Sequence, residues 1–205
     1  MLGTGNDIVA LAAINVERTR QVNFYSKILS HSEHQLYSGL QIQLPFENFV
    51  WLAWSVKESA YKFLKRFTPE LVFSSTKIII SKLEPGPEFE GSDVYTGTVQ
   101  FKTHQLYFRT IVNQNYIFSV VNFKDDFTHT RWAIRRIDSS DHIQQSAEVR
   151  KLLLGDLADL QPGNNFTVNK SSYGWPVITE DEQEMPLPVS LAHHGHYVAY
   201  SFQLK

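Results

Sequence analysis

Residues 49–67 combine two patterns of side chains in one predicted helix. Apolar residues recur at steps of three and four, the spacing of a buried helical stripe; they are Phe49, Ala53, Val56, Ala60, Phe63 and Phe67. The side about half a turn away carries two indoles and then charged groups, namely Trp51, Trp54, Glu58, Lys62 and Lys65. Because large aromatic side chains are poorly suited to water, we expect this second side to be covered as well.

Glu58 and Lys62 lie one helical turn apart on that second side. A structural ion pair between the two side chains would explain the spacing. A position at the polar end of a cleft would explain it equally well. The helix alone leaves both interpretations open.

The elements predicted before this helix are a strand at residues 8–11, a helix at residues 14–25 and a helix from Ser30 to Tyr37. Asp7 lies near the start of the strand, and Ser30 with Glu33 fits a capping box. The helix of residues 50–65 ends near Pro69, because proline disfavours helix in the residue before it. Apolar and alternating runs then predict strands at residues 77–83, 94–102, 106–112 and 116–123.

After the charged residues 124–126 the order of strand, helix and strands occurs again in shorter form. The predicted elements are a strand at 131–137, a helix with caps at 139–141, and strands at 166–168, 176–178, 188–191 and 197–202. The stripe of this second helix includes Ile143, Ala147, Val149 or Arg150, Leu153, Leu154 and Leu157. The matching order predicts an α+β fold of two pseudo-duplicated halves, residues 1–124 and 125–205, each with a helix packed on an antiparallel sheet. The cleft between the halves is the natural ligand site.

Composition excludes several classes of protein. A chain of 205 residues with 42% hydrophobic and 20% charged residues is typical of a globular protein. A formal net charge of -2 gives no bulk attraction to nucleic acid or to an anionic membrane. No apolar run is long enough to span a bilayer, and the absence of cysteine excludes disulfides, thiolate metal sites and cysteine nucleophiles. Since no secretory signal is visible, we expect a cytoplasmic protein.

Asp7, Glu58 and Lys62 suggest one chemical explanation. Two carboxylates brought together by the fold can hold a hard cation such as Mg²⁺ and leave positions for water and phosphate. A lysine beside them supplies a point charge for a phosphate or a leaving group. The alternatives are a turn residue at Asp7 and a salt bridge between Glu58 and Lys62.

Three histidines, His193, His194 and His196, raise the question of a zinc site. On a strand leading into a turn their side chains would point in different directions, and no thiolate is present to complete the site. A single histidine that donates to a phosphate or a purine is an alternative, and so is a histidine satisfied within the protein.

Five segments together resemble the motifs of the 4'-phosphopantetheinyl transferases. They are Gly5-Asn6-Asp7-Ile8-Val9, Lys27-Ile28-Leu29-Ser30-His31-Ser32-Glu33, Trp54-Ser55-Val56-Lys57-Glu58-Ser59-Ala60-Tyr61-Lys62, Gly174-Trp175-Pro176 and Ser190-Leu191-Ala192-His193. The third segment is the most specific, because it is similar to the family's Trp-(Ser/Thr)-x-Lys-Glu-(Ser/Ala)-x-x-Lys helix. The five occur in one order and span residues 5 to 193.

The resemblance implies transfer of the phosphopantetheine arm of coenzyme A to a serine of an acyl or peptidyl carrier protein, with release of 3',5'-ADP. By position, Asp7 and Glu58 would hold Mg²⁺ against the pyrophosphate. Lys62 would neutralise or protonate the departing phosphate, and either Glu58 or a metal-bound water would be the base. The residues that would contact coenzyme A are Lys57, Lys62, His193 and Lys27.

Departures from the family pattern leave alternatives. Val9 and Ala10 stand where related enzymes often carry an acid, so the chain lacks one candidate metal ligand or base. A homologue that binds coenzyme A or a carrier without turnover is therefore a second hypothesis. A metal-dependent phosphodiesterase that uses Asp7, Glu58 and Lys62 is a third.

The length matches the pseudo-dimeric members of the family, whereas the order of the motifs is that of the short trimeric ones. One chain would form a complete cleft, so we expect a monomer. The second half of the chain, with coenzyme A between, would cover the Trp51 and Trp54 side of the long helix. Because carriers are typically acidic, docking would use Lys27, Arg66 and residues 35–45.

Overall fold

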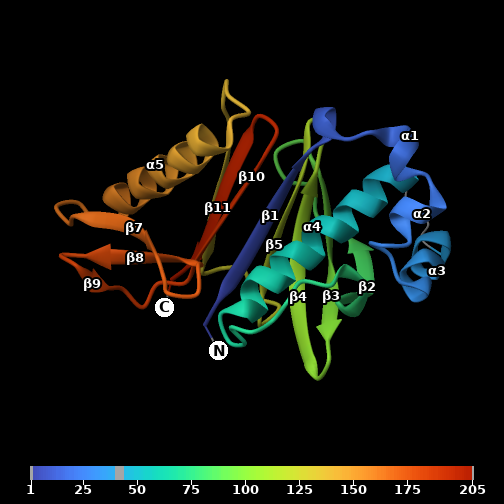
Figure 1. The fold of residues 1–205 in the computed structure, drawn as a ribbon, viewed down its shortest axis with the longest axis horizontal. Helices are drawn as coiled ribbons and strands as arrows, with labels where there is room; N and C mark the ends of the chain where they lie inside the picture. The colour runs from blue at the N-terminus through green and yellow to red at the C-terminus, as the bar shows by residue number, and fades with distance from the viewer. Residues whose placement is uncertain (1, 40–43, 205) are drawn as a thin grey trace.

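The computed structural model describes residues 2–39 and 44–204, and its elements follow the predicted order (Figure 1). The first nine are β1 (Thr4–Ala10), α1 (Val16–Thr19), α2 (Val22–Tyr25), α3 (His31–Gly39), α4 (Phe46–Lys65), β2 (Ile79–Pro85), β3 (Asp93–Phe101), β4 (His104–Val112) and β5 (Tyr116–Asn122). The remainder are β6 (Thr130–Arg136), α5 (His142–Leu160), β7 (Phe166–Lys170), β8 (Pro176–Glu180), β9 (Gln183–Glu184), β10 (Val189–His194) and β11 (Tyr197–Gln203). None of the helices in this described part of the chain combines the length and apolarity that a membrane span needs.

The two halves repeat one strand order. The first sheet runs β1-β5-β4-β3-β2, and the second half contains a sheet β10-β11-β6 and a separate sheet β7-β8-β9. β6, β11 and β10 correspond to β1, β5 and β4, and the long helix α5 follows β6 as α4 follows β1. The predicted α+β class with antiparallel sheets is confirmed. The division at residue 124 falls in the loop between β5 and β6 and stays a prediction.

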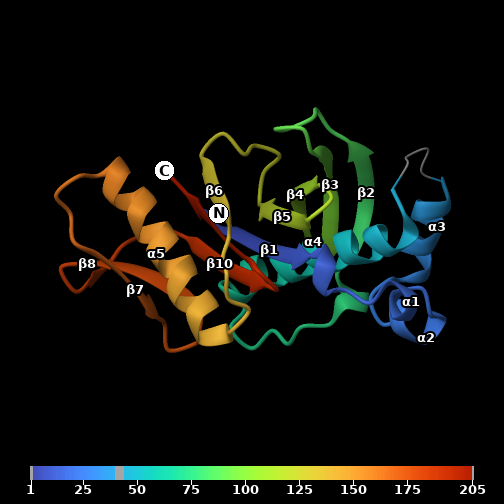
Figure 2. The same ribbon diagram turned by 90° about the horizontal axis from the view of Figure 1, so that it is seen from above.

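β1 lies at the centre of the molecule, between β5 of the first half and β10 of the second (Figures 1 and 2). Its side chains alternate between two apolar cores. Val9 belongs to the core under α4, whereas Ile8 belongs to a core shared with Ala192 of β10 and Ala199 of β11. The two halves are therefore joined by a shared apolar core behind β1.

The predicted stripe of α4 is confirmed, because Phe49, Ala53, Val56, Ala60 and Phe63 are wholly buried. Phe67 lies beyond the end of the helix and is 44% exposed.

The predicted stripe of α5 is wrong at its start. Ile143 is 78% exposed and Ala147 is exposed as well, whereas the buried residues of the helix include Val149, Leu153 and Leu157. Six residues at about 100° each place Ile143 roughly 240° around the helix from Val149. Ile143 therefore points to solvent.

The single helix predicted over residues 14–25 is also wrong, since α1 and α2 are separate four-residue helices. Gln21 has an extended backbone, with φ -76° and ψ 133°, and it breaks the helix. Asn15 caps α1 by accepting a hydrogen bond from the amide of Arg18, while the Thr19 hydroxyl donates to the Asn15 carbonyl at 2.8 Å. These local bonds satisfy one short turn rather than a continuous helix.

Gly5 lets β1 lie directly against α4. A Cβ atom at this position would overlap the Ser59 carbonyl oxygen and lie 2.8 Å from the amide nitrogen of Phe63. Any side chain would push the strand away from the helix. Asp7, two residues along the same face of β1, would move with it.

Gly5→Ala is therefore expected to destabilise the protein by about 1–3 kcal/mol or more, the range for an overpacked core. Urea unfolding measures the loss. Gly155→Ala is the matched control, because its Cβ would meet no atom within 4 Å on helix α5; it should stabilise the protein by up to about 1 kcal/mol. Equal midpoints for Gly5→Ala and wild type would contradict the close approach of strand and helix.

Candidate functional site

The fold brings Asp7 of β1 against Lys62 of α4. The Lys62 Nζ atom lies 3.0 Å from Asp7 Oδ1 and also donates to the Asn6 carbonyl oxygen at 3.0 Å. Asp7 is 8% exposed, and its other oxygen, Oδ2, is buried without a hydrogen-bond partner among the described residues. One carboxylate oxygen is thus left free for a ligand that is not part of the protein.

Glu58, one turn before Lys62, completes a group of two carboxylates and one ammonium. Burial raises the pKa of Glu58, Lys62 lowers it, and the charge of Asp7 raises it further. Burial likewise raises the pKa of Asp7, against the opposing effect of Lys62. Lys62 pairs with Asp7 rather than with Glu58, so the simple salt bridge between Glu58 and Lys62 is not the arrangement observed.

This group suits a divalent cation. When both carboxyl groups are ionised they carry more negative charge than the Lys62 ammonium can balance, and Asp7 Oδ2 has no hydrogen-bond partner among the described residues. Within residues 2–39 and 44–204 no three His, Cys, Asp or Glu side chains form a metal-binding group. Mg²⁺ is commonly held by one or two carboxylates and keeps several waters, so the residues present fit such an ion.

Side chains of strand β10 accept hydrogen bonds from the edge of β1 that does not pair with β5. Ser190 Oγ accepts a hydrogen bond from the Asn6 amide at 3.0 Å, and His194 Nδ1 accepts one from the Ala10 amide at 2.9 Å. Because Nδ1 accepts, the neutral imidazole of His194 carries its proton on Nε2. Burial lowers the pKa of His194, which favours this neutral form.

His193 points to the opposite face of β10 from His194. Its ring meets the ring of His142, the first residue of α5, edge to face at 4.7 Å. Burial lowers the pKa of His193, and the neighbouring side chains of His142 and Lys62 lower it further. The structure therefore brings the predicted His193 to the Lys62 side of the interface between the halves.

A cavity of about 260 Å³ opens between the end of α4 and the second half. Its lining residues are Tyr61, Lys62, Lys65, Arg66, Tyr173, Gly174, Trp175, Pro176, Val189, Ser190 and Leu191. The rings of Tyr173 and Trp175 are stacked, with centroids 5.1 Å apart. Lys62 thus joins the acidic group to a cavity with one aromatic wall.

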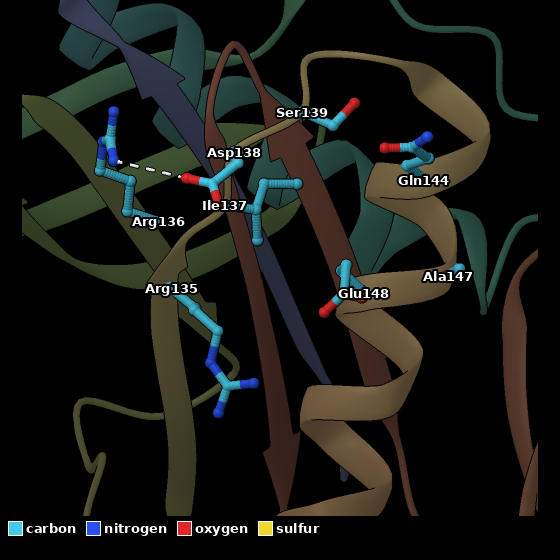
Figure 3. A pocket seen from close by; sticks show the side chains of 8 residues that line it. All are labelled: Arg135, Arg136, Ile137, Asp138, Ser139, Gln144, Ala147 and Glu148. Atoms are coloured by element: carbon cyan, nitrogen blue, oxygen red, sulfur yellow. Dashed lines mark ion pairs between the residues drawn. The ribbon is translucent and has the colours of Figure 1, made fainter.

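A larger hollow of about 690 Å³ lies elsewhere, between the end of β6 and the start of α5 (Figure 3). Arg135 and Arg136 reach its rim, and Arg136 lies 3.9 Å from Asp138. None of the residues predicted for chemistry lines this hollow. Size alone therefore does not select it as the reactive site.

Lys57 does not line the cavity of about 260 Å³, and its contact with coenzyme A, implied by the family resemblance, stays a prediction. It is wholly buried, and its Nζ atom donates to Glu33 Oε2 and to the Ile28 carbonyl oxygen, both at 2.6 Å. Successive residues on a helix point about 100° apart, so Lys57 faces the core while Glu58 faces Asp7. The capping box of Ser30 and Glu33 is present, with the Ser30 amide donating to Glu33 Oε2 at 2.7 Å.

Lys27, between α2 and α3, is exposed and is not among the residues that line the cavity. Residues 40–43 of the predicted docking segment 35–45 lie outside the described residues.

The cover over the indoles of α4 comes from the first half, not from the second half as predicted. Trp51 donates through Nε1 to Thr19 Oγ1 at 3.0 Å and packs on Phe24, while Trp54 packs on Phe73. The second half instead covers the end of the helix, at Lys62 and beyond. The indoles therefore anchor α4, and the interface with the second half begins about two turns after Trp54.

The sequence did not single out Ser190, His194 or Arg66 for the contacts that they make. Ser190 and His194 lie four residues apart on one strand, so they share a face, but nothing local indicates that the face meets β1. Only the fold identifies their partners, which are 184 residues away.

Comparison with known families agrees with the geometry. A family model described as the 4'-phosphopantetheinyl transferase superfamily matches residues 3–121, more than half of the chain. No curated protein and no solved structure matches the chain significantly. The matched segment contains Asp7, Glu58 and Lys62, whereas the turn at Gly174 and strand β10 lie outside it.

Proposed function

The chain belongs to the 4'-phosphopantetheinyl transferase superfamily, and on that premise we propose that it transfers the phosphopantetheine arm of coenzyme A to a serine of a carrier protein. The main support is the convergence of Asp7, Glu58 and Lys62 beside a cavity lined by both halves. In this reaction the serine oxygen forms a bond to the phosphorus that carries the pantetheine arm. The bond from that phosphorus to the bridging oxygen breaks, and 3',5'-ADP leaves.

Asp7 and Glu58 are the residues that would hold Mg²⁺. When bound, such an ion supplies positive charge that stabilises the negative oxygens of the pyrophosphate. Lys62 reaches Asp7 with its ammonium group and is placed to donate to the departing phosphate. Phosphoryl transfer depends mainly on positioning and charge stabilisation, which these three residues support.

We propose that Glu58 is the base that accepts the hydroxyl proton of the carrier serine. Burial and the charge of Asp7 raise the pKa of this carboxyl group, and a base is most effective when its pKa lies nearer the working pH. The proton therefore leaves the serine oxygen for a Glu58 oxygen as the new bond to phosphorus forms.

The cavity between the halves would receive the nucleotide end of coenzyme A. Tyr173 and Trp175 offer aromatic faces on which a purine can stack. Trp175 stands where the Gly-Lys-Pro motif of the family has lysine. A ligand would therefore stack on the indole here instead of pairing with an ammonium group. His193 is not among the residues that line this cavity, so the hydrogen bond that its ring can donate would reach a part of coenzyme A outside the cavity.

The direct test is to incubate the protein with coenzyme A, Mg²⁺ and an apo-carrier protein, and to weigh the carrier by mass spectrometry. A gain equal to one phosphopantetheine arm is expected. Lys62→Met should lower kcat by about 10²–10³-fold, the loss typical of one donor to a developing negative charge. Lys77→Met removes an exposed lysine that does not line the cavity and should leave kcat unchanged.

The same assay separates the other hypotheses. Binding of coenzyme A, measured by calorimetry, without any mass gain in several acyl and peptidyl carriers would contradict transfer and favour a binding protein. Release of 3',5'-ADP in the absence of a carrier would favour a phosphodiesterase. Because both halves line the cavity, we further propose that a single chain is active as a monomer.

A further inference from the structure

Arg66 joins the end of α4 to the second half of the chain. Its Nη2 atom donates hydrogen bonds to the carbonyl oxygen of Pro176, at 3.0 Å, and to that of Val189. Pro176 is the first residue of β8, and Val189 is the first residue of β10. One guanidinium group therefore holds the starts of two strands that form the second wall of the cavity.

Arg66 continues a row of functional positions along α4. Glu58, Lys62 and Arg66 are spaced by four residues, so they lie along one side of the helix. Glu58 and Lys62 lie beside Asp7 in the first half, whereas the Arg66 side chain reaches the second half. Among the described residues, Arg66 supplies the hydrogen bonds that run from the end of α4 to the second half; the others near the cavity run from β1.

The Arg66 guanidinium group already donates hydrogen bonds to these two carbonyl oxygens. Burial lowers the pKa of Arg66 to about 10, and the charge of Glu184 opposes that change. The side chain thus remains protonated at neutral pH and keeps its donors. Its neighbour Lys65 donates to the carbonyl oxygens of Pro69 and Leu71, each at 3.1 Å, within its own half.

We propose that Arg66 is a positioning residue that sets the distance between Lys62 and the turn of Tyr173–Pro176, and through it the affinity for the nucleotide end of coenzyme A. The inference rests on the proposed function. A ligand in this cavity would touch α4 on one side and the aromatic turn on the other. If the turn moves away, binding to the nucleotide weakens, while the acidic group on the first half stays in place.

The test compares wild type with Arg66→Met and Arg66→Lys. Arg66→Met should raise both the KM for coenzyme A and the Kd for 3',5'-ADP, measured by calorimetry, by about tenfold or more, because small displacements have large effects on bound geometry. The KM for the carrier should not change, because the Arg66 guanidinium group is bound to two carbonyl oxygens of its own chain and so is not expected to dock a carrier, unlike in the expectation from sequence. Arg66→Lys should recover part of the affinity, since one ammonium can donate to two carbonyls, as Lys65 does.

Two control variants separate positioning from general stability. Leu153→Ala removes a wholly buried side chain from the core of the second half, and Leu153 is not among the residues that line the cavity. It should lower the melting temperature without changing the KM for coenzyme A. Arg20→Met removes a two-bond arginine pair with Glu47 inside the first half and should also leave this KM unchanged.

The outcomes distinguish the two proposals. If wild type transfers the arm and Arg66→Met behaves like Leu153→Ala, with lower stability and unchanged KM and Kd, the role of Arg66 is overturned and the proposed function stands. If wild type neither binds 3',5'-ADP nor modifies a carrier, the proposed function and the role of Arg66 are both overturned.

Discussion

Glu58→Gln is expected to abolish transfer of the phosphopantetheine arm and, at the same time, to raise the melting temperature of the metal-free protein. The loss follows because the amide removes both a proposed metal ligand and the proposed base. The gain follows because Glu58 lies beside a second buried carboxylate, and burial and the charge of Asp7 raise its pKa. A chain of this size shifts by roughly 2–4 °C for each kcal/mol, so the change is measurable by calorimetry.

The pH dependence has a defined sign. Burial raises the pKa of Asp7 and Glu58, so each group binds its proton more tightly in the folded protein than in the unfolded chain. Their contribution to stability is complete below the ordinary carboxyl pKa and is lost as pH rises through the raised values. The advantage of Glu58→Gln over wild type should therefore grow from acid to neutral pH. An advantage that shrinks over this range would contradict the assignment.

Added Mg²⁺ gives an independent readout. Wild type should gain thermal stability with the ion, because a ligand that binds only the folded state stabilises it. Glu58→Gln should gain little. A variant that responds to Mg²⁺ as wild type does would show that Glu58 is not a ligand.

Lys57→Met is expected to cost about 3–5 kcal/mol of stability, because it leaves the carboxylate of Glu33 buried without its cation. Both side chains are 0% exposed. The expected fall in melting temperature is roughly 6–20 °C, and urea unfolding measures the free energy directly. Unchanged stability with weakened coenzyme A binding would instead favour the contact implied by the family resemblance.

A double variant provides the control for this prediction. Glu33 Oε1 accepts a hydrogen bond from the Ile80 amide at 2.8 Å, and a glutamine at position 33 can keep an acceptor there. Lys57→Met combined with Glu33→Gln should therefore recover much of the stability lost in Lys57→Met alone. A double variant that is as unstable as the sum of both single variants would show that the two charges are not coupled.

The course of the chain was largely predictable from periodicity. The apolar spacing in α4 predicted its buried face because one strong period extends over five turns. The prediction of one helix over residues 14–25 was wrong because hydrogen bonds around Asn15 and Thr19 compete with a continuous helix. Such local hydrogen bonds do not alter the spacing of apolar residues, so that spacing cannot reveal them.

The candidate site was predictable only in part. Asp7 and Lys62 are 55 residues apart in sequence, and the family pattern named both. That pattern also assigned Lys57 to the cofactor, because neighbours in a motif are read together although their side chains diverge on the helix. The partners of Arg66 lie 110 and 123 residues away; Pro176 belongs to a family motif and Val189 precedes another, but the motifs do not show that their carbonyl oxygens face Arg66, so only the three-dimensional structure identifies the pairing.

The attachment of β1 to the second half has a consequence for how the protein folds as it is synthesised. Gly3 bonds to Gln203 and Asn6 to Ser190, contacts separated by 200 and 184 residues. Contacts between such distant residues slow folding. A strand edge whose partner has not yet formed leaves backbone groups unpaired and is prone to aggregation. During translation, β1 can pair with β5 and receive α4, but its other edge stays open until β10 and β11 leave the ribosome. The cavity, which residues of β10 line, therefore cannot form before β10 is available, and until then one edge of β1 is open to association with other chains.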